Sequence, residues 1–99
     1  MTFIPFLPRF REPIRRGTKT MTTRSRPYGE PGETLDSNGF TIRLIRVFTS
    51  TARDVAQDFY REEGCSSPEE FLTIWREIHP TLPLDRLVFV HEFEKGEPR

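Results

Sequence analysis

The chain has 99 residues, which is enough for one domain with a thin hydrophobic core and too few for two. Hydrophobic residues make up 34% of the chain, charged residues make up 30%, and the formal net charge is zero. Nine residues are Phe, whose side chains each bury a large apolar area, so the composition argues for a folded chain and against a disordered one. We therefore expect residues 1–99 to form a single domain.

Cysteine and histidine content argues against a disulfide and a metal site. Cys65 is the only cysteine, so no intramolecular disulfide is possible and the chain suits a reducing compartment. His79 and His91 have no cysteine at metal-binding spacing, and we expect neither a metal nor another cofactor. The apolar stretch 1–7 contains Pro5 and is too short for a signal peptide or a membrane span. We expect a cytoplasmic protein without a membrane partner.

The zero net charge conceals an uneven distribution of charge along the chain. Residues 1–26 carry seven basic side chains and one acidic side chain, a net charge of +6, while the remaining residues carry eight basic and fourteen acidic ones, a net charge of −6. A basic segment attracts phosphate groups, and an acidic remainder limits indiscriminate binding. The alternative is that these charges are scattered over an ordinary solvated surface.

The first part of the chain predicts two short strands on either side of a helical turn. Residues 2–6 are expected to form the first strand, and Pro8 begins a helix. Because Pro13 is tolerated only in a first turn, this helix must be short, kinked or late in starting. Gly17 is expected to end it in the left-handed conformation. Residues 20–24 then have the alternating, Thr-rich composition of a strand.

Turn residues in the middle of the chain predict a β-hairpin. Pro31-Gly32 is typical of a type II turn, and Asn38-Gly39 is a strong signal for a two-residue hairpin loop. This loop is expected to join a strand at residues 34–35 to a longer one at residues 40–48. The apolar positions of the longer strand change parity after Leu44, which predicts a β-bulge or a sharp bend.

Capping residues mark two helices in the second half of the chain. Thr51 and Ser67 are expected to be their N-caps, and Ser67 is followed by a proline at the first helical position. The expected elements are helices at residues 52–63 and 68–79, a strand at residues 87–93 and a frayed tail at residues 94–99.

One segment combines a helix that ends at glycine with a Lys-Thr-x-Thr-x-Arg strand. Its residues are Phe10, Arg11, Glu12, Gly17, Thr18, Lys19, Thr20, Met21, Thr22, Thr23 and Arg24. This segment resembles the opening signature of ASCH domains. The likeness continues in the Pro31-Gly32-Glu33 turn, in Glu62-Glu63-Gly64 before a helix, and in the closing strand from Val88 to Phe93. The resemblance implies an α+β fold: a PUA-like, mostly antiparallel β-barrel with two to three flanking helices.

The resemblance implies several functions. RNA binding, or binding of a modified nucleoside, is the general expectation for the family. Some small stand-alone members are N(4)-acetylcytidine amidohydrolases, and some relatives are ribonucleases. In the amidohydrolases a threonine of the signature strand acts with a lysine and a glutamate, which implies Thr22, Lys19 and Glu63 here, with Glu62 as the alternative acid. A threonine hydroxyl needs an adjacent base, and a lysine can serve if partial burial lowers its pKa.

The candidate nucleic-acid contacts lie close together in the sequence. They are Arg15, Arg16, Lys19, Arg24, Arg26 and Tyr28. Basic side chains bind phosphates, and an aromatic ring in a loop can stack on a base, which is how single-stranded RNA is usually held. The structural alternative for Tyr28 is a loop aromatic ring folded onto the expected barrel. Phe71 and Trp75 are interpreted as core residues, because their spacing fits one buried helix face.

Overall fold

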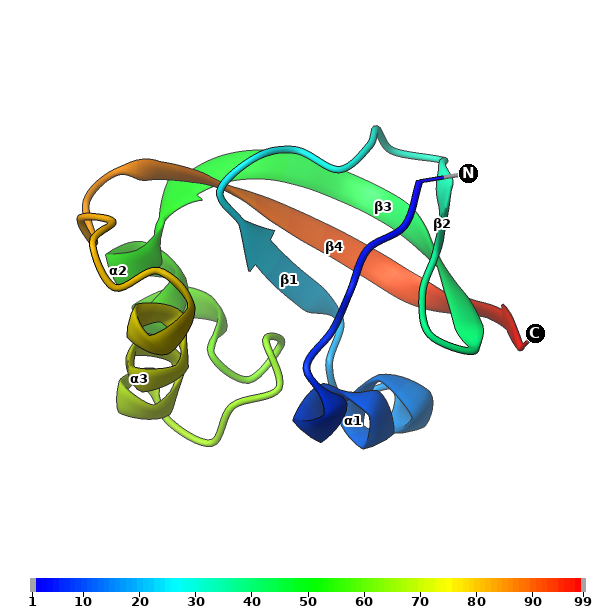
Figure 1. Ribbon diagram of the computed structural model, residues 1–99, viewed down its shortest axis with the longest axis horizontal. Helices are drawn as coiled ribbons and strands as arrows, with labels where there is room; N and C mark the ends of the chain where they lie inside the picture. Colours follow the sequence, from blue (N-terminus) through cyan, green and yellow to red (C-terminus); the bar gives the residue numbers. More distant parts are fainter. Residues whose placement is uncertain (1, 99) are drawn as a thin grey trace.

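The computed structural model describes residues 2–98, with only the backbone of residues 97 and 98. Its helices and strands are the 3₁₀ turn Pro8–Phe10, α1 (Arg11–Arg16), β1 (Met21–Arg24), β2 (Thr34–Asp36), β3 (Phe40–Thr51), α2 (Ala52–Phe59), α3 (Pro68–Ile78) and β4 (Leu87–Pro98). The strands form an antiparallel sheet in the order β1-β4-β3-β2, and the helices lie on one side of it (Figure 1). The expected α+β fold with mostly antiparallel strands is confirmed.

The sheet is open, so the expected closed barrel is wrong. β1 and β2 lie at its two edges, and residues 2–6, expected to be a strand, form only an isolated parallel bridge with Asp36. The backbone N–H of Ile4 donates to the Asp36 carbonyl at 2.8 Å, but the next residue, Pro5, has no N–H with which to continue a ladder. The N-terminal segment therefore crosses from β2 to α1 as irregular backbone (Figure 1).

Several local predictions from turn residues are confirmed. Gly17 ends α1 in the left-handed conformation, with φ of 79°. Gly32 also has a positive φ, as the third residue of a type II turn requires, and Asn38-Gly39 joins β2 to β3. The parity change in β3 is a β-bulge, because the register with β4 shifts between Leu44 and Arg46.

α2 is shorter than the helix expected at residues 52–63 and ends at Phe59. Residues 60–64 form a turn instead, which directs the backbone carbonyl of Glu62 toward the start of β1. The N–H groups of residues 20 and 21 donate to this carbonyl at 2.8 and 2.9 Å. Both bonds connect segments about forty residues apart, and no helix-stop signal in the local sequence predicts them.

β4 is longer than expected and includes most of the segment predicted to be a frayed tail at residues 94–99. Lys95 pairs with Ile42 of β3, and Glu94 forms a cross-strand ion pair with Arg43, whose Nε lies 2.8 Å from a carboxylate oxygen. The early part of β3 thus supplies the pairing partner that a free tail would lack. The last residue of the chain lies outside the described residues.

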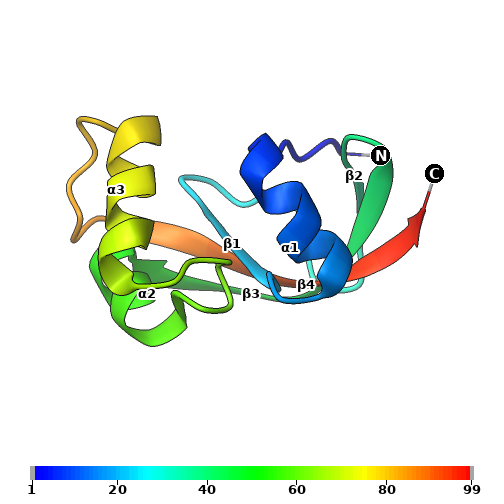
Figure 2. The same ribbon diagram turned by 90° about the horizontal axis from the view of Figure 1, so that it is seen from below.

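The core consists of two clusters at opposite ends of the sheet. One cluster packs α2 and α3 against the sheet and includes Trp75 and Val90. The other packs the N-terminal segment and α1 against the sheet and includes Ile4 and Leu44. Phe10 packs against both clusters. Figure 2 shows α1 and the α2–α3 pair as separate groups on the sheet, so the boundary between the clusters lies beside β1.

Candidate binding pocket

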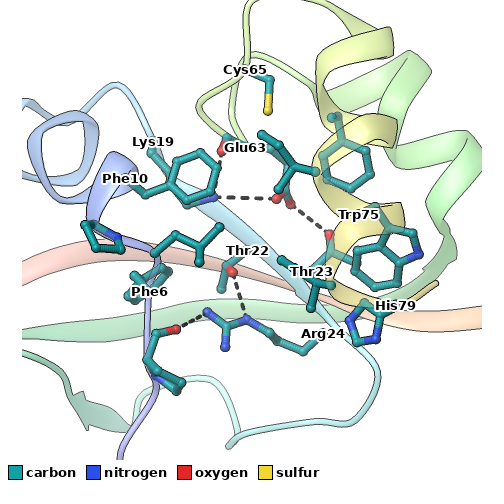
Figure 3. Close-up of a pocket in the computed structure, with 16 residues that line it drawn as sticks. Phe6, Phe10, Lys19, Thr22, Thr23, Arg24, Glu63, Cys65, Trp75 and His79 are labelled. Carbon is teal, nitrogen blue, oxygen red and sulfur yellow. Dashed lines mark hydrogen bonds and ion pairs between the residues drawn. The ribbon is translucent and has the colours of Figure 1, made fainter.

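A cavity of about 300 Å³ lies where the two core clusters meet. Its lining comes from the N-terminal segment, from the residues around β1, from the turn after α2, and from α3 (Figure 3). Most of the lining side chains are aromatic or aliphatic. The lining side chains that are charged or can form hydrogen bonds include Lys19, Thr22, Thr23, Arg24, Glu63, Trp75 and His79. A small, mostly apolar cavity with a few fixed polar groups is typical of a small-molecule site.

Lys19 and Glu63 form a buried ion pair in this cavity. Nζ of Lys19 lies 3.6 Å from Oε1 of Glu63, and it donates to the backbone carbonyls of Glu63 at 2.6 Å and of Met21 at 2.8 Å. The ammonium group also lies 4.3 Å from the centre of the Phe10 ring. Burial lowers the pKa of Lys19, and the charge of Glu63 partly opposes this shift. Lys19 lies between Gly17 and the start of β1, outside the regular strand.

The two neighbouring threonines of β1 contact different polar groups. Thr23 Oγ1 donates to Oε2 of Glu63 at 2.8 Å, so both carboxylate oxygens of Glu63 have a partner. Thr22 Oγ1 accepts a hydrogen bond from Nε of Arg24 at 3.0 Å, which leaves its own proton free to donate to a ligand. Because β1 is an edge strand, residues from both of its faces reach the cavity along its free edge.

The Arg24 side chain is held between the N-terminal segment and Tyr28. One terminal nitrogen of its guanidinium donates to the Pro5 carbonyl at 2.6 Å. The guanidinium carbon lies 5.0 Å from the centre of the Phe6 ring and 5.2 Å from that of Tyr28. Burial lowers the pKa of Arg24. Arg26 lies over the Tyr28 ring at 4.3 Å, so Tyr28 is packed among protein groups in the absence of a ligand.

α3 and its C-cap contribute Trp75, interpreted from the sequence as a core residue, and His79 to the cavity lining. Their ring centres lie 4.3 Å apart with planes tilted by 41°. His79 is the C-cap of α3 and is partly buried. Burial and the positive charge of Arg24 lower its pKa. The spacing along α3 indicates a packed face, and only the placement of this helix beside the cavity shows that the face also lines a site.

The three candidate catalytic residues come together in this cavity. Lys19, Thr22 and Glu63 all line it, whereas the side chain of Glu62 does not. Their catalytic role stays a prediction. Thr23 was not a candidate, although its hydroxyl contacts Glu63. No sequence signal marked Thr23, because strand parity places it on the face opposite Thr22.

The candidate nucleic-acid contacts divide into two groups. Lys19 and Arg24 line the cavity, and Lys19 is only 3% exposed, so it is not available to a phosphate on the protein surface. Arg15, Arg16 and Arg26 are exposed. Arg15 forms an ion pair with Glu12 on α1, which offsets its charge locally. An RNA-binding surface formed by the exposed arginines stays a prediction.

The described part of the chain has neither a metal-binding cluster nor a membrane-spanning helix. Among the side chains of residues 2–96, no group of three His, Cys, Asp or Glu is arranged to hold a metal ion. In the same stretch, no helix has the length and apolar character needed to cross a bilayer. Cys65 lines the cavity as a buried thiol, and burial raises its pKa to about 11, so it stays protonated near neutral pH.

Solved structures with the same arrangement of elements cover most of this chain. The crystal structure of a protein from Enterococcus faecalis matches all of it and 82% of its own chain, with a TM-score of 0.78 and 18% identity. The crystal structure of the ASCH domain from Lactobacillus crispatus matches 85% of this chain and 68% of its own, with a TM-score of 0.64 and 17% identity. This chain is an ASCH-like domain in its fold.

A third structure extends the comparison of the ASCH-like domain. The solution structure of a protein from Pyrococcus furiosus matches 94% of each chain, with a TM-score of 0.69 and 19% identity. No protein-family model and no curated protein matches the sequence. At these identities the comparisons establish the fold, and the function of the ASCH-like domain depends on its own side chains.

Proposed function

We propose that this ASCH-like domain binds a modified nucleoside, with the base inserted into the cavity between the two core clusters. The observation that carries the proposal is the cavity itself: about 300 Å³ in volume, with aromatic walls and a few polar groups held in fixed positions. Aromatic walls favour a planar heterocycle, and the polar groups give it an orientation. The small volume favours a single nucleoside over several bases of an RNA strand.

The polar groups of the cavity suit the hydrogen-bonding edge of a base. The Thr22 hydroxyl retains a proton for a carbonyl oxygen or a ring nitrogen, because its oxygen already accepts from Arg24. The Glu63 carboxylate has spare lone pairs that can accept from an exocyclic N–H. Lys19 holds this carboxylate in place and offsets its charge. A base with both a donor and an acceptor on its edge satisfies these groups, as an N-acylated cytosine does.

Isothermal titration calorimetry with N(4)-acetylcytidine and with cytidine tests the proposal. We expect saturable binding of the modified nucleoside and weaker binding of cytidine. Trp75, the only tryptophan of the chain, lines the cavity, so its indole resonance in an NMR spectrum should shift on binding. Absence of both heat and shift at millimolar nucleoside would exclude this function.

Hydrolysis of an N-acyl group is a second candidate function, favoured by the convergence of Lys19, Thr22 and Glu63. In this reaction Thr22 Oγ attacks the amide carbonyl carbon as its proton passes to a base, and Lys19 can be that base because burial lowers its pKa. The proton that Lys19 has taken from Thr22 passes by way of the paired Glu63 carboxylate to the leaving amine as the C–N bond breaks. Water hydrolyses the resulting acyl ester and regenerates the threonine.

Mass spectrometry of N(4)-acetylcytidine incubated with the protein tests this second function. The Thr22→Val variant is the sharper probe, because Lys19→Ala would leave Glu63 as a buried unpaired charge and so destabilise the fold. We expect wild-type protein and Thr22→Ser to release cytidine and Thr22→Val to release none. Wild-type protein that leaves the substrate intact at high concentration over hours would exclude the enzyme.

A further inference from the structure

Arg24 is a partly buried cation without an acidic partner. Its guanidinium donates to the Thr22 hydroxyl and the Pro5 carbonyl and also interacts with the Tyr28 side chain. Among the described residues no carboxylate lies within ion-pair distance of its guanidinium. Lys19, in the same cavity, is paired with Glu63. Tyr28 and the charge of Glu63 partly stabilise the Arg24 cation, but it lacks the direct ion pair that Lys19 has, which favours an anionic ligand.

His79 adds a second basic group next to Arg24. Among the groups that the structure describes, none forms a hydrogen bond with its imidazole ring, which packs against Trp75 and lines the cavity. Arg24 on β1 is the charged group that acts on it. Both ring nitrogens of His79 are thus available to a ligand. The positive charge of Arg24 makes protonation of His79 less favourable, and a protonated His79 would in turn destabilise the Arg24 cation. An anion between them would reverse this effect.

The two ends of the cavity differ in charge. Lys19 and Glu63 lie together at one end, and Arg24 and His79 lie at the other (Figure 3). At the first end the charges of Lys19 and Glu63 balance each other in an ion pair, whereas the end with Arg24 and His79 has an excess of positive charge. A nucleotide has a similar polarity, because its sugar separates a nearly neutral base from an anionic phosphate.

We propose that Arg24 and His79 form an anion subsite that holds the phosphate of a nucleoside monophosphate whose base lies toward Lys19 and Glu63. This inference rests on the proposed nucleoside-binding function and names its ligand class. Arg24 supplies a permanent charge with planar donors, and His79 donates from its ring. The preferred ligand is then the phosphorylated nucleoside.

Calorimetry with N(4)-acetylcytidine, its 5′-monophosphate and a trinucleotide that contains the same base tests the subsite. We expect the monophosphate to bind about tenfold more tightly than the nucleoside at pH 6, as one added charge-assisted contact implies. Equal affinities for the two would overturn the subsite and leave nucleoside binding intact. A gain seen only with the trinucleotide would also overturn it, because the phosphate would then belong to an RNA chain. Absence of binding by all three ligands would overturn the proposed function.

Two variants and a matched control test whether Arg24 and His79 cause the tighter binding of the monophosphate. His79→Gln and Arg24→Gln should each remove most of the tenfold gain, whereas Arg76→Gln, an exposed position on α3, should keep it. The phosphate itself ionises near pH 6, so the affinity for the monophosphate varies with pH even without His79. The informative quantity is therefore the difference between wild type and His79→Gln in how this affinity varies with pH. If Arg24→Gln fails to fold, His79→Gln alone decides, and an unchanged gain in that variant overturns the subsite.

Discussion

At the scale of single residues, the position and charge of the Glu63 carboxylate depend on two neighbouring polar side chains of the cavity. Glu63 is 4% exposed, and its carboxylate is held by Lys19 on one oxygen and by the Thr23 hydroxyl on the other. A buried carboxylate is stable in its charged form only with such partners. Thr23 therefore positions the acid, although it lies on the strand face opposite Thr22.

The Thr23→Val variant tests this positioning role. The change keeps the shape of the side chain and removes the hydroxyl that donates to Glu63. The free energy of unfolding should therefore fall by about 1.5–3 kcal/mol, the usual range for a hydrogen bond to a charged group. Urea denaturation measures the loss. Thr49→Val, at an exposed position of β3, is the matched control and should change stability by less than about 0.5 kcal/mol. Equal stability of the two variants would contradict the role.

His91 is a further buried titratable residue, and its side chain is fully buried. Its Nε2 accepts from the Tyr28 backbone N–H at 3.0 Å, and its Nδ1 lies 3.2 Å from the Thr22 carbonyl, so a proton on Nδ1 satisfies both contacts. Burial lowers the pKa of His91, and the hydrogen bond to Thr22 partly opposes the shift. The ring thus fixes the loop before β2 against β1.

This lowered pKa makes stability depend on pH in a defined direction. Above about pH 6.5 the ring is neutral in both the folded and unfolded states, and His91 adds no pH dependence. As the pH falls below that value, the unfolded chain takes up a proton that the folded chain refuses, so stability decreases by up to about 1.4 kcal/mol per pH unit. Urea denaturation between pH 7.5 and 5.5 measures the slope. It should persist in His79→Gln, where His91 is the remaining histidine; a flat profile in that variant would refute the assignment.

At the scale of elements, α3 determines one wall of the cavity. The helix begins at its predicted cap, where the Ser67 side chain accepts from the Glu70 N–H at 3.1 Å. Trp75 and His79 project from its second half into the lining of the cavity. The stability of this helix is therefore linked to the geometry of the site.

The Ser67→Ala variant tests the contribution of the cap. Loss of an N-cap hydroxyl leaves a helix N–H without its partner and should lower the free energy of unfolding by about 1 kcal/mol. Ser66→Ala is the control, because Ser66 uses its backbone N–H, not its hydroxyl, to bind Glu70. Thermal unfolding followed by circular dichroism measures both. A loss in Ser66→Ala as large as that in Ser67→Ala would show that the cap is not the cause.

At the scale of the whole molecule, the exposed basic residues near the N-terminus remain candidates for RNA. Arg16 and Arg26 are exposed and have no ion pair among the described residues. If they bind RNA phosphates, replacing either with Gln should lower the slope of log affinity against log salt by about one unit. Arg53→Gln, at a residue paired with Asp85, serves as the control. Affinity for RNA that does not vary with salt concentration would contradict an electrostatic RNA surface.

Local chemistry allowed the sequence alone to determine much of the fold. Turn and cap residues act through their own backbone conformation, which is why Gly17, Gly32 and Asn38-Gly39 were placed correctly. The parity change after Leu44 likewise predicted the bulge in β3, because strand side chains alternate strictly. The α+β class followed from these elements and from the resemblance of the signature strand to ASCH domains.

Only the tertiary structure decided whether the sheet closes and which residues share the cavity. Closure depends on pairing between segments far apart in the chain, and Pro5 interrupts the ladder that the N-terminal segment would need. Thr23 and His79 join the site because β1 is an edge strand and α3 packs beside its free edge. Strand parity and helical spacing describe one element at a time, whereas a pocket forms between elements, so its membership depends on packing that a local pattern does not encode.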